Sequence, residues 1–328
     1  MIGPGDDLEK LSKSKDHLGV LRYIRAHELR KPATVISHGQ ALLGDKLNNA
    51  LDDTAARAAA LEQICLAAID TDNHALAERC LDELKTISTT SPATNDNVKD
   101  NNNEVGSLVE DSDRYRRLLG RLLEASGDYD GALSLYDKML KGNPSNLVAL
   151  QRKYCVLRAQ QKEPMEVVLN AADEYLGQQL SDVSAWYEMS QLRLSIGDFK
   201  GAAYALEQVV LGSPLDADLH RELAEVYATI GGLENTTYAR KHMAQALELE
   251  PTNIRAQFGL VSVANQYLDE LSNASNSKRK QLDEHERKVA IELVRYGAGE
   301  VLKSYKACPK MFPTVKRLMD DYTENIAE

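Results

Sequence analysis

Apolar residues recur every three to four positions along most of this chain, in segments separated by short polar turns. In 53–70, for example, they fall at Leu61, Ile64, Cys65 and Ala68. Because an α-helix has about 3.6 residues per turn, this spacing places them on one helical face. The pattern predicts helices over residues 16–30, 34–47, 53–70, 75–86, 147–160, 165–178, 254–271, 278–305 and 309–325.

The sequence also repeats with a longer period of about 34 residues. The clearest repeats have small residues within their two helices, a Gly-Asp-aromatic turn between the helices and a proline after the second helix. The positions of this period are Gly120, Ala132, Tyr136 and Pro144, then Trp186, Ala202 and Pro214, then Ala239, Ala246 and Pro251. Small side chains let helix axes approach to roughly 8–10 Å, and proline ends a helix because it lacks the amide donor. This is the spacing of tetratricopeptide (TPR) repeats. It predicts an all-α fold, a TPR-type right-handed α-solenoid of stacked antiparallel helix pairs.

The period also divides the sequence into regions. Residues 1–87 are predicted as an N-terminal helical region with a degenerate repeat, 113–271 as the TPR repeats with a following helix, and 272–328 as a helical cap. The repeats span 113–146, 147–180, 183–216 and 217–252, and the last has a longer turn at 231–235. Residues 88–112 are rich in Ser, Thr, Asn and Asp. With few apolar side chains to bury, they are predicted to form a loop or disordered insertion.

Composition narrows the functional classes. The net charge of −11 disfavours nucleic-acid binding, which uses a basic surface. The four cysteines are scattered, which predicts buried thiols in a reducing compartment rather than a disulfide framework. The N-terminus lacks the apolar stretch of a signal peptide, so no secretion is predicted. The longest uncharged runs fall short of the roughly 20 apolar residues that cross a bilayer, so no membrane span is expected.

Candidate catalytic chemistry is weak throughout. The seven histidines follow no metal-ligand spacing, and the sequence has neither a phosphate-binding glycine loop nor a Gly-x-Ser-x-Gly nucleophile motif. We therefore predict a protein that is not an enzyme and that uses no cofactor and no metal.

A partner-binding groove is the expected functional surface, because the first helix of each TPR pair lines the concave side of the stack. Its predicted lining residues are Arg114, Arg117, Arg121, Gln151, Arg158, Tyr187 and Gln191. Either a solvated helix face or a partner-binding patch would explain this row. Chaperone-binding TPR proteins hold a terminal carboxylate with lysine and asparagine. Arg117 and Arg121 replace those residues here, and Ser184 and Glu188 stand where two basic residues are needed, so chaperone-tail binding is disfavoured.

Several segments are more specific than the TPR pattern: 124–146, 186–190, the Gly-Gly-Leu-Glu-Asn run at 231–235, 239–247 and 255–260. They resemble the family of subunit 2 of the endoplasmic reticulum (ER) membrane protein complex, closely over residues 113–265 and more loosely over 16–87. The insertion at 88–112 departs from the compact spacing of that family.

The resemblance implies a non-catalytic cytosolic scaffold, peripheral on the cytosolic face of the ER membrane. The expected partners are the cytosolic parts of membrane subunits 1, 3 and 5 of that complex and, in many lineages, a subunit 8/9-type protein. The complex inserts tail-anchored and other transmembrane proteins. The repeat period alone implies only a partner-binding solenoid, so a free TPR adaptor or co-chaperone is the alternative.

Overall fold

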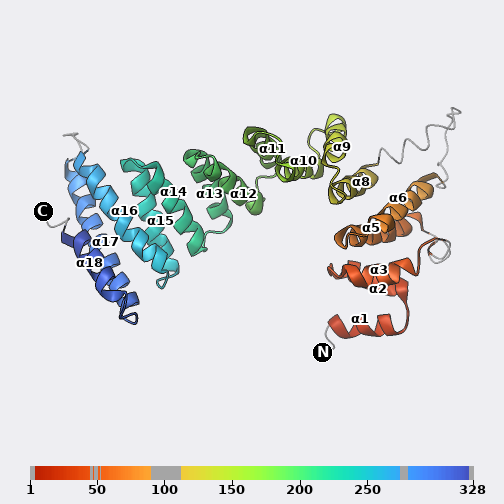
Figure 1. Cartoon of the computed structure of the whole chain (residues 1–328), viewed down its shortest axis with the longest axis horizontal. Coiled ribbons are helices and arrows are strands. Elements are labelled where there is room, and N and C mark those ends of the chain that lie inside the picture. Colours follow the sequence, from red (N-terminus) through yellow and green to blue (C-terminus); the bar gives the residue numbers. More distant parts are fainter. Residues whose placement is uncertain are drawn as a thin grey trace. The chain divides into compact units, whose positions relative to one another are not determined.

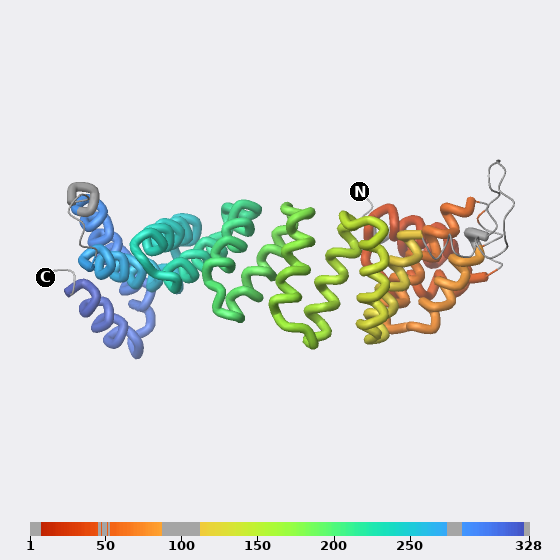
Figure 2. The backbone as a smooth tube through the Cα atoms, turned by 90° about the horizontal axis from the view of Figure 1, so that it is seen from above, coloured from red at the N-terminus to blue at the C-terminus, as the bar shows by residue number. Residues whose placement is uncertain are grey.

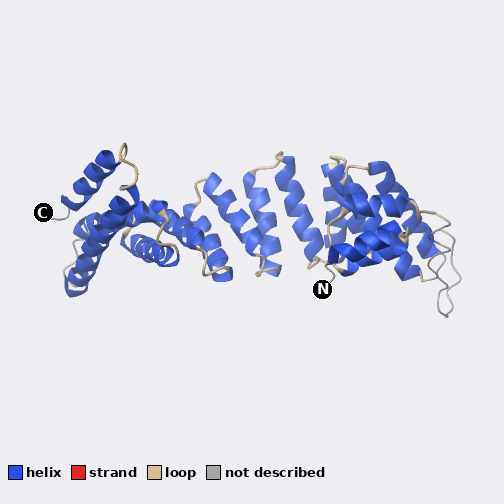
Figure 3. Cartoon of the chain, turned by 90° about the horizontal axis from the view of Figure 1, so that it is seen from below, coloured by secondary structure: helices blue, strands red, loops and turns tan. Residues whose placement is uncertain are grey.

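The computed structural model describes residues 4–44, 47, 51, 53–89, 112–273 and 280–324. All regular structure in these ranges is helical (Figure 3). The protein divides into two compact units, Met1–Ala171 and Ala172–Glu328. Most of the predicted insertion, 90–111, lies outside the described residues, as do 278 and 279 at the predicted start of the charged helix.

The helices of the first unit are labelled in Figure 1: α1 (Pro4–Lys13), α2 (His17–Ala26), α3 (Pro32–Gln40), α5 (Thr54–Asp70), α6 (His74–Thr89), α8 (Asp113–Ala125), α9 (Tyr129–Gly142) and α10 (Leu147–Gln160). The boundary between the units falls within α11 (Met165–Gln178). The second unit continues with α12 (Val183–Ser195), α13 (Phe199–Gly212), α14 (Ala217–Ile230), α15 (Leu233–Leu249), α16 (Ile254–Asn273), α17 (Lys280–Tyr305) and α18 (Phe312–Glu324).

Consecutive helices pack on one another from α1 to α10 and again from α12 to α18, as in α8 on α9 and α12 on α13. Consecutive helices from α12 to α15 alternate in direction along the sequence (Figure 2). The predicted fold class, all-α with antiparallel helix pairs of the TPR type, is confirmed within each unit.

The repeat positions lie in the core. Ala132, Ala202, Ala239 and Ala246 are fully buried, and Trp186 is only 6% exposed. Helices α9, α13 and α15 each end two residues before the predicted proline.

Close packing explains the glycine of the first skeleton. A Cβ atom on Gly120 would lie 2.4 Å from the hydroxyl oxygen of Tyr136, which is itself fully buried. An alanine at 120 would therefore displace the aromatic ring that fills the space between α8 and α9.

The predicted Gly-Asp turns have the expected geometry. Gly127 and Gly197 adopt φ values of +79° and +77°, which glycine tolerates because it has no Cβ. Asp128 and Asp198 follow as N-caps, and their carboxylates accept hydrogen bonds from the amides of Gly131 and Gly201.

The turn predicted at 231–235 is wrong. Helix α14 ends at Ile230 and α15 starts at Leu233, so the turn is only Gly231 and Gly232, both with positive φ. The extra residues lengthen α15 instead. The hydroxyl of Thr236 donates to the carboxylate of Glu270 on α16 at 2.8 Å and lies 3.2 Å from the backbone carbonyl of Gly232, and this contact with α16 anchors the start of α15.

The N-terminal region differs from the prediction at α1, α2 and α3, and α3 ends at Gln40 instead of 47. Helix α1 was not predicted, because Leu8 and Leu11 are too few apolar residues to reveal a period. Helix α2 ends at Ala26 instead of 30, just before Glu28, whose φ is +51°. Helix α3 starts at Pro32 instead of 34, because proline fits the first turn of a helix, where no amide donor is needed.

The prediction of buried thiols is correct for Cys65 and Cys80 and wrong for Cys308, which is exposed; Cys155 is half-buried. All four thiols are free, and burial raises the pKa of Cys65 and of Cys80 to about 12. In the described part of the protein, no helix combines the length and apolar character that a membrane crossing needs.

Candidate interaction surface

The predicted arginine row lies on the exposed face of α8. Arg114, Arg117 and Arg121 are all exposed. The guanidinium of Arg114 lies 3.2 Å from the carboxylate of Glu62 on α5, and that of Arg117 donates to the backbone carbonyl of Asp113. Among the described residues, Arg121 pairs with no carboxylate. Within the described ranges, Arg117 and Arg121 therefore have no carboxylate partner. The ion pair of Arg114 is weak, since an ion pair near the surface contributes only ~0–1 kcal/mol.

A partly buried ion pair lies at the other end of α8. Arg152 of α10 donates to both carboxylate oxygens of Glu124, and the hydroxyl of Tyr136 donates to the same carboxylate at 2.5 Å. Burial and the adjacent Glu124 charge raise the pKa of Tyr136, which keeps its hydroxyl protonated as the donor. This network fixes α10 against α8. The predicted residues Gln151 and Arg158 are exposed on that same α10.

Tyr187 and Gln191 lie on α12, in the second unit. Tyr187 is 37% exposed, and partial burial followed by the charge of Glu222 raises its pKa. Gln191 is exposed and its side-chain amide is 3.5 Å from the hydroxyl of Ser190. These two residues therefore share a helix with each other but belong to a different unit from the α8 row.

An ion-pair network on α14 and α16 was not predicted from the sequence. Arg255 donates two hydrogen bonds of 2.7 Å to Glu225, which also accepts from the largely buried Arg221. Arg221 additionally reaches Asp218 at 3.1 Å. These charges satisfy one another, so this part of the helix face offers few unpaired groups to a partner. Nothing in the local spacing shows that residues 30 positions apart will meet.

The histidines form two pairs that the sequence did not predict. The Nδ1 atoms of His17 and His38 are 2.9 Å apart, and those of His220 and His242 are 3.0 Å apart. Burial, followed by the neighbouring His220, lowers the pKa of His242. No group of three or more His, Cys, Asp or Glu side chains suited to a metal ion occurs among the residues that the structure describes.

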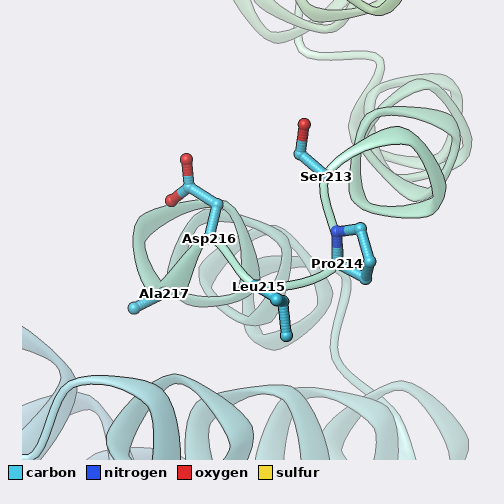
Figure 4. A pocket seen from close by; sticks show the side chains of 5 residues that line it. All are labelled: Ser213, Pro214, Leu215, Asp216 and Ala217. Atoms are coloured by element: carbon cyan, nitrogen blue, oxygen red, sulfur yellow. The ribbon is translucent and has the colours of Figure 1, made fainter.

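A hollow of about 500 Å³ lies at the turn between α13 and α14 (Figure 4). It is lined by Ser213, Pro214, Leu215, Asp216 and Ala217. In Figure 4 the side chains of Leu215 and Asp216 leave the turn in different directions. The hollow is wide open, and two of its five lining residues, Ser213 and Asp216, carry polar side chains.

Comparison with known proteins gives consistent matches. The family described as EMC2 TPR-like repeat domain matches residues 108–239. The protein is 30% identical over 282 residues to ER membrane protein complex subunit 2-A of Xenopus laevis, a match that covers 86% of this chain and 83% of that protein. It is 24% identical over 298 residues to ER membrane protein complex subunit 2 of Dictyostelium discoideum, with 87% and 85% covered.

Solved structures with a similar fold are more distant in sequence. YrrB, a TPR protein, is 16% identical and has a TM-score of 0.41, over 65% of this chain and 96% of that one. A crystal structure of MamA is 17% identical with a TM-score of 0.38, over 60% and 92%.

Proposed function

Since this chain belongs to the family of ER membrane protein complex subunit 2, we propose that it is a non-catalytic scaffold subunit of that complex on the cytosolic face of the ER membrane. In this role it binds the cytosolic parts of membrane subunits 1, 3 and 5 and, where the lineage has one, a subunit 8/9-type protein. It thereby supports insertion of tail-anchored and other transmembrane proteins.

The observation that carries the proposal is the extent of the family relationship. The match to the Xenopus laevis protein covers 86% of this chain, and therefore reaches into both compact units, so it is not the likeness of one isolated repeat. A scaffold needs exposed side chains for partners and a fold that is rigid behind them. Helix α8 has both, since its arginines face solvent while Leu118 and Leu122 are buried.

The α8 arginines define the partner chemistry at this face. Arginine presents a planar fork of donors that binds a carboxylate through two parallel hydrogen bonds. Arg121 can form such a bond directly, and Arg114 can do so by exchanging its exposed contact with Glu62. We therefore expect an acidic segment, or the terminal carboxylate, of a membrane subunit to contact α8.

The test is affinity purification of the tagged protein from detergent-solubilised membranes, followed by mass spectrometry. Recovery of multi-pass ER membrane proteins in stoichiometric amounts supports the scaffold role. Recovery of chaperones alone would support a free TPR adaptor or co-chaperone and reject the proposal.

A second experiment tests the α8 face. In the variant R114E/R117E/R121E we expect capture of membrane subunits to weaken while circular dichroism stays unchanged. The difference from the wild type should shrink at raised salt, because salt screens these exposed charges. The matched control reverses two exposed lysines on α9, Lys138 and Lys141. Equal capture by the folded triple variant and the control would place the contact elsewhere.

A further inference from the structure

The turns between α11 and α12, between α13 and α14, and between α15 and α16 share one hydrogen bond. In each, a side-chain nitrogen in the first turn of the following helix donates to a backbone carbonyl six residues earlier. The pairs are Trp186 with Leu180 at 2.9 Å, His220 with Pro214 at 3.1 Å, and Gln257 with Pro251 at 2.8 Å. The three turns are thus held in the same way at the same end of their helices.

These turns also lie against their neighbours. A Cβ atom on Gly212, at the end of α13, would be 2.3 Å from the side chain of Val183, at the start of α12. The side-chain amide of Asn253, just before α16, lies 3.4 Å from the carboxylate of Asp218 on α14. The three turns therefore form one continuous edge of the second unit.

The α11–α12 and α13–α14 turns of this edge carry exposed leucines. Leu180, Leu211 and Leu215 are 69%, 75% and 81% exposed. The repeat pattern does not require leucine there. Counting back from the closing proline, Leu211 stands where the other repeats have Lys141 and Glu248.

Leu215 is unusual in the same way, because Ser145 and Thr252 follow the corresponding prolines. Leucine at positions that are otherwise polar, clustered on one edge, is typical of a binding surface.

The charge around these leucines is predominantly negative. Residues 178–183, 211–218 and 248–254 contain five carboxylates and neither lysine nor arginine. One of the five, Asp218, pairs with Arg221, which also pairs with Glu225, and Arg255 pairs with Glu225 as well. Asp216, Glu248 and Glu250 form no ion pair with a residue that the structure describes.

The corresponding turn of the first unit provides a contrast. Residues 141–148 contain Lys141 and no carboxylate. The combination of exposed leucine and negative charge is therefore a property of these turns and does not follow from the repeat itself.

We propose that this edge, defined by Leu180, Leu211 and Leu215 with Asp216, Glu248 and Glu250, binds a cationic amphipathic helix of a partner protein. Leucines of the edge receive the apolar face of the helix, and the carboxylates pair with the flanking lysines or arginines. The site goes beyond the scaffold role proposed above, because it is remote in sequence from the arginines of α8 and selects a partner of opposite charge. An anionic membrane surface does not fit, since the carboxylates repel it.

The probe is a fluorescent peptide of leucine and lysine, about 18 residues long, whose leucines fall on one face of a helix of about 27 Å. Binding to the full-length protein is followed by fluorescence anisotropy. A second peptide of the same composition has its leucines scattered around the helix. We expect the amphipathic peptide to bind at least about tenfold more tightly than the scattered one.

Two variants test the edge itself. L180S/L211S/L215S removes the apolar contacts, and D216N/E248Q/E250Q removes charge while asparagine keeps the N-cap of α14. We expect each to weaken binding about tenfold, and the second to lose most of the salt dependence. The matched control is Leu147→Ser in the first unit, where leucine is 40% exposed, and it should bind like the wild type.

Several outcomes would overturn the proposal. They are equal binding of both peptides, unchanged binding by a folded edge variant, and an equal loss in Leu147→Ser. Light scattering and flotation with anionic vesicles test the other occupants. Self-association or vesicle binding that the leucine variant abolishes would assign the edge to a second copy or to lipid. The peptide assay uses the isolated protein, so a negative result there rejects the binding edge without bearing on the scaffold role, which the purification of membrane subunits tests.

Discussion

Trp186 offers a sharp test of the repeat assignment, because the repeat places it in the core. Its side chain is 6% exposed, and its indole nitrogen donates to the carbonyl of Leu180. Its ring packs edge to face against that of Tyr204, with 5.8 Å between the ring centroids. Trp186→Ala removes all three contributions and leaves a cavity between α12 and α13. We expect the free energy of unfolding to fall by about 3–5 kcal/mol, as for other buried tryptophans.

The parts of this loss can be separated with two further variants. Trp186→Phe keeps most of the ring volume but not the hydrogen bond, and should cost about 1–2 kcal/mol. Tyr204→Ala loses mainly the edge contact of a half-exposed ring, which is worth about 1 kcal/mol.

The assay is urea denaturation followed by circular dichroism, because replacing the only tryptophan removes the intrinsic fluorescence signal. The urea dependence of the unfolding free energy must be the same in wild type and variants for the free energies to be compared. A loss below about 1 kcal/mol for Trp186→Ala would mean that the indole is not packed in the core, and would refute the assigned repeat phase.

Three other predictions follow from the packing and charges. In urea denaturation, Gly120→Ala should lower the free energy of unfolding by about 1–3 kcal/mol, because the added Cβ meets Tyr136, which is buried and hydrogen-bonded. Gly259→Ala should cost less than about 1 kcal/mol, because its Cβ meets the flexible end of Met243. Equal costs for the two variants would contradict this reasoning. The guanidinium of Arg240 binds the carboxylate of Glu286 on α17 and stacks on the ring of Tyr267. Arg240→Leu should therefore lower the free energy of unfolding by about 2–3 kcal/mol and speed amide hydrogen exchange in α17. Unchanged exchange would argue against this anchor. The fold lowers the pKa of His242 below its ordinary value of 6.5, so the unfolded state binds protons at this imidazole more readily than the folded state. The contribution of neutral His242 to the free energy of unfolding should therefore be fully present above pH 6.5 and be lost as the pH falls below it. His242→Gln should flatten that part of the pH profile of urea denaturation.

The regular part of this fold was predictable because its causes are local. The positive φ of Gly127 and Gly197, the caps at Asp128 and Asp198, and the prolines that follow α9, α13 and α15 each depend on a few neighbouring residues. The same holds for the alanines, since a small side chain is needed wherever two helices cross. For the arginine surface of α8, the sequence predicted only that the three arginines share one exposed helix face.

The repeat pairs, the ends of α9, α13 and α15 and the family membership were thus contained in the sequence, because they depend on spacing between residues. Only the tertiary structure decided which long side chains meet: Arg114 with Glu62, Arg255 with Glu225, and His220 with His242. It also decided that the Gly-Gly-Leu-Glu-Asn run lengthens a helix and that the leucines of the turn edge face solvent. These features arise between residues that are distant in sequence, where packing and charge, and not the local period, select the contact.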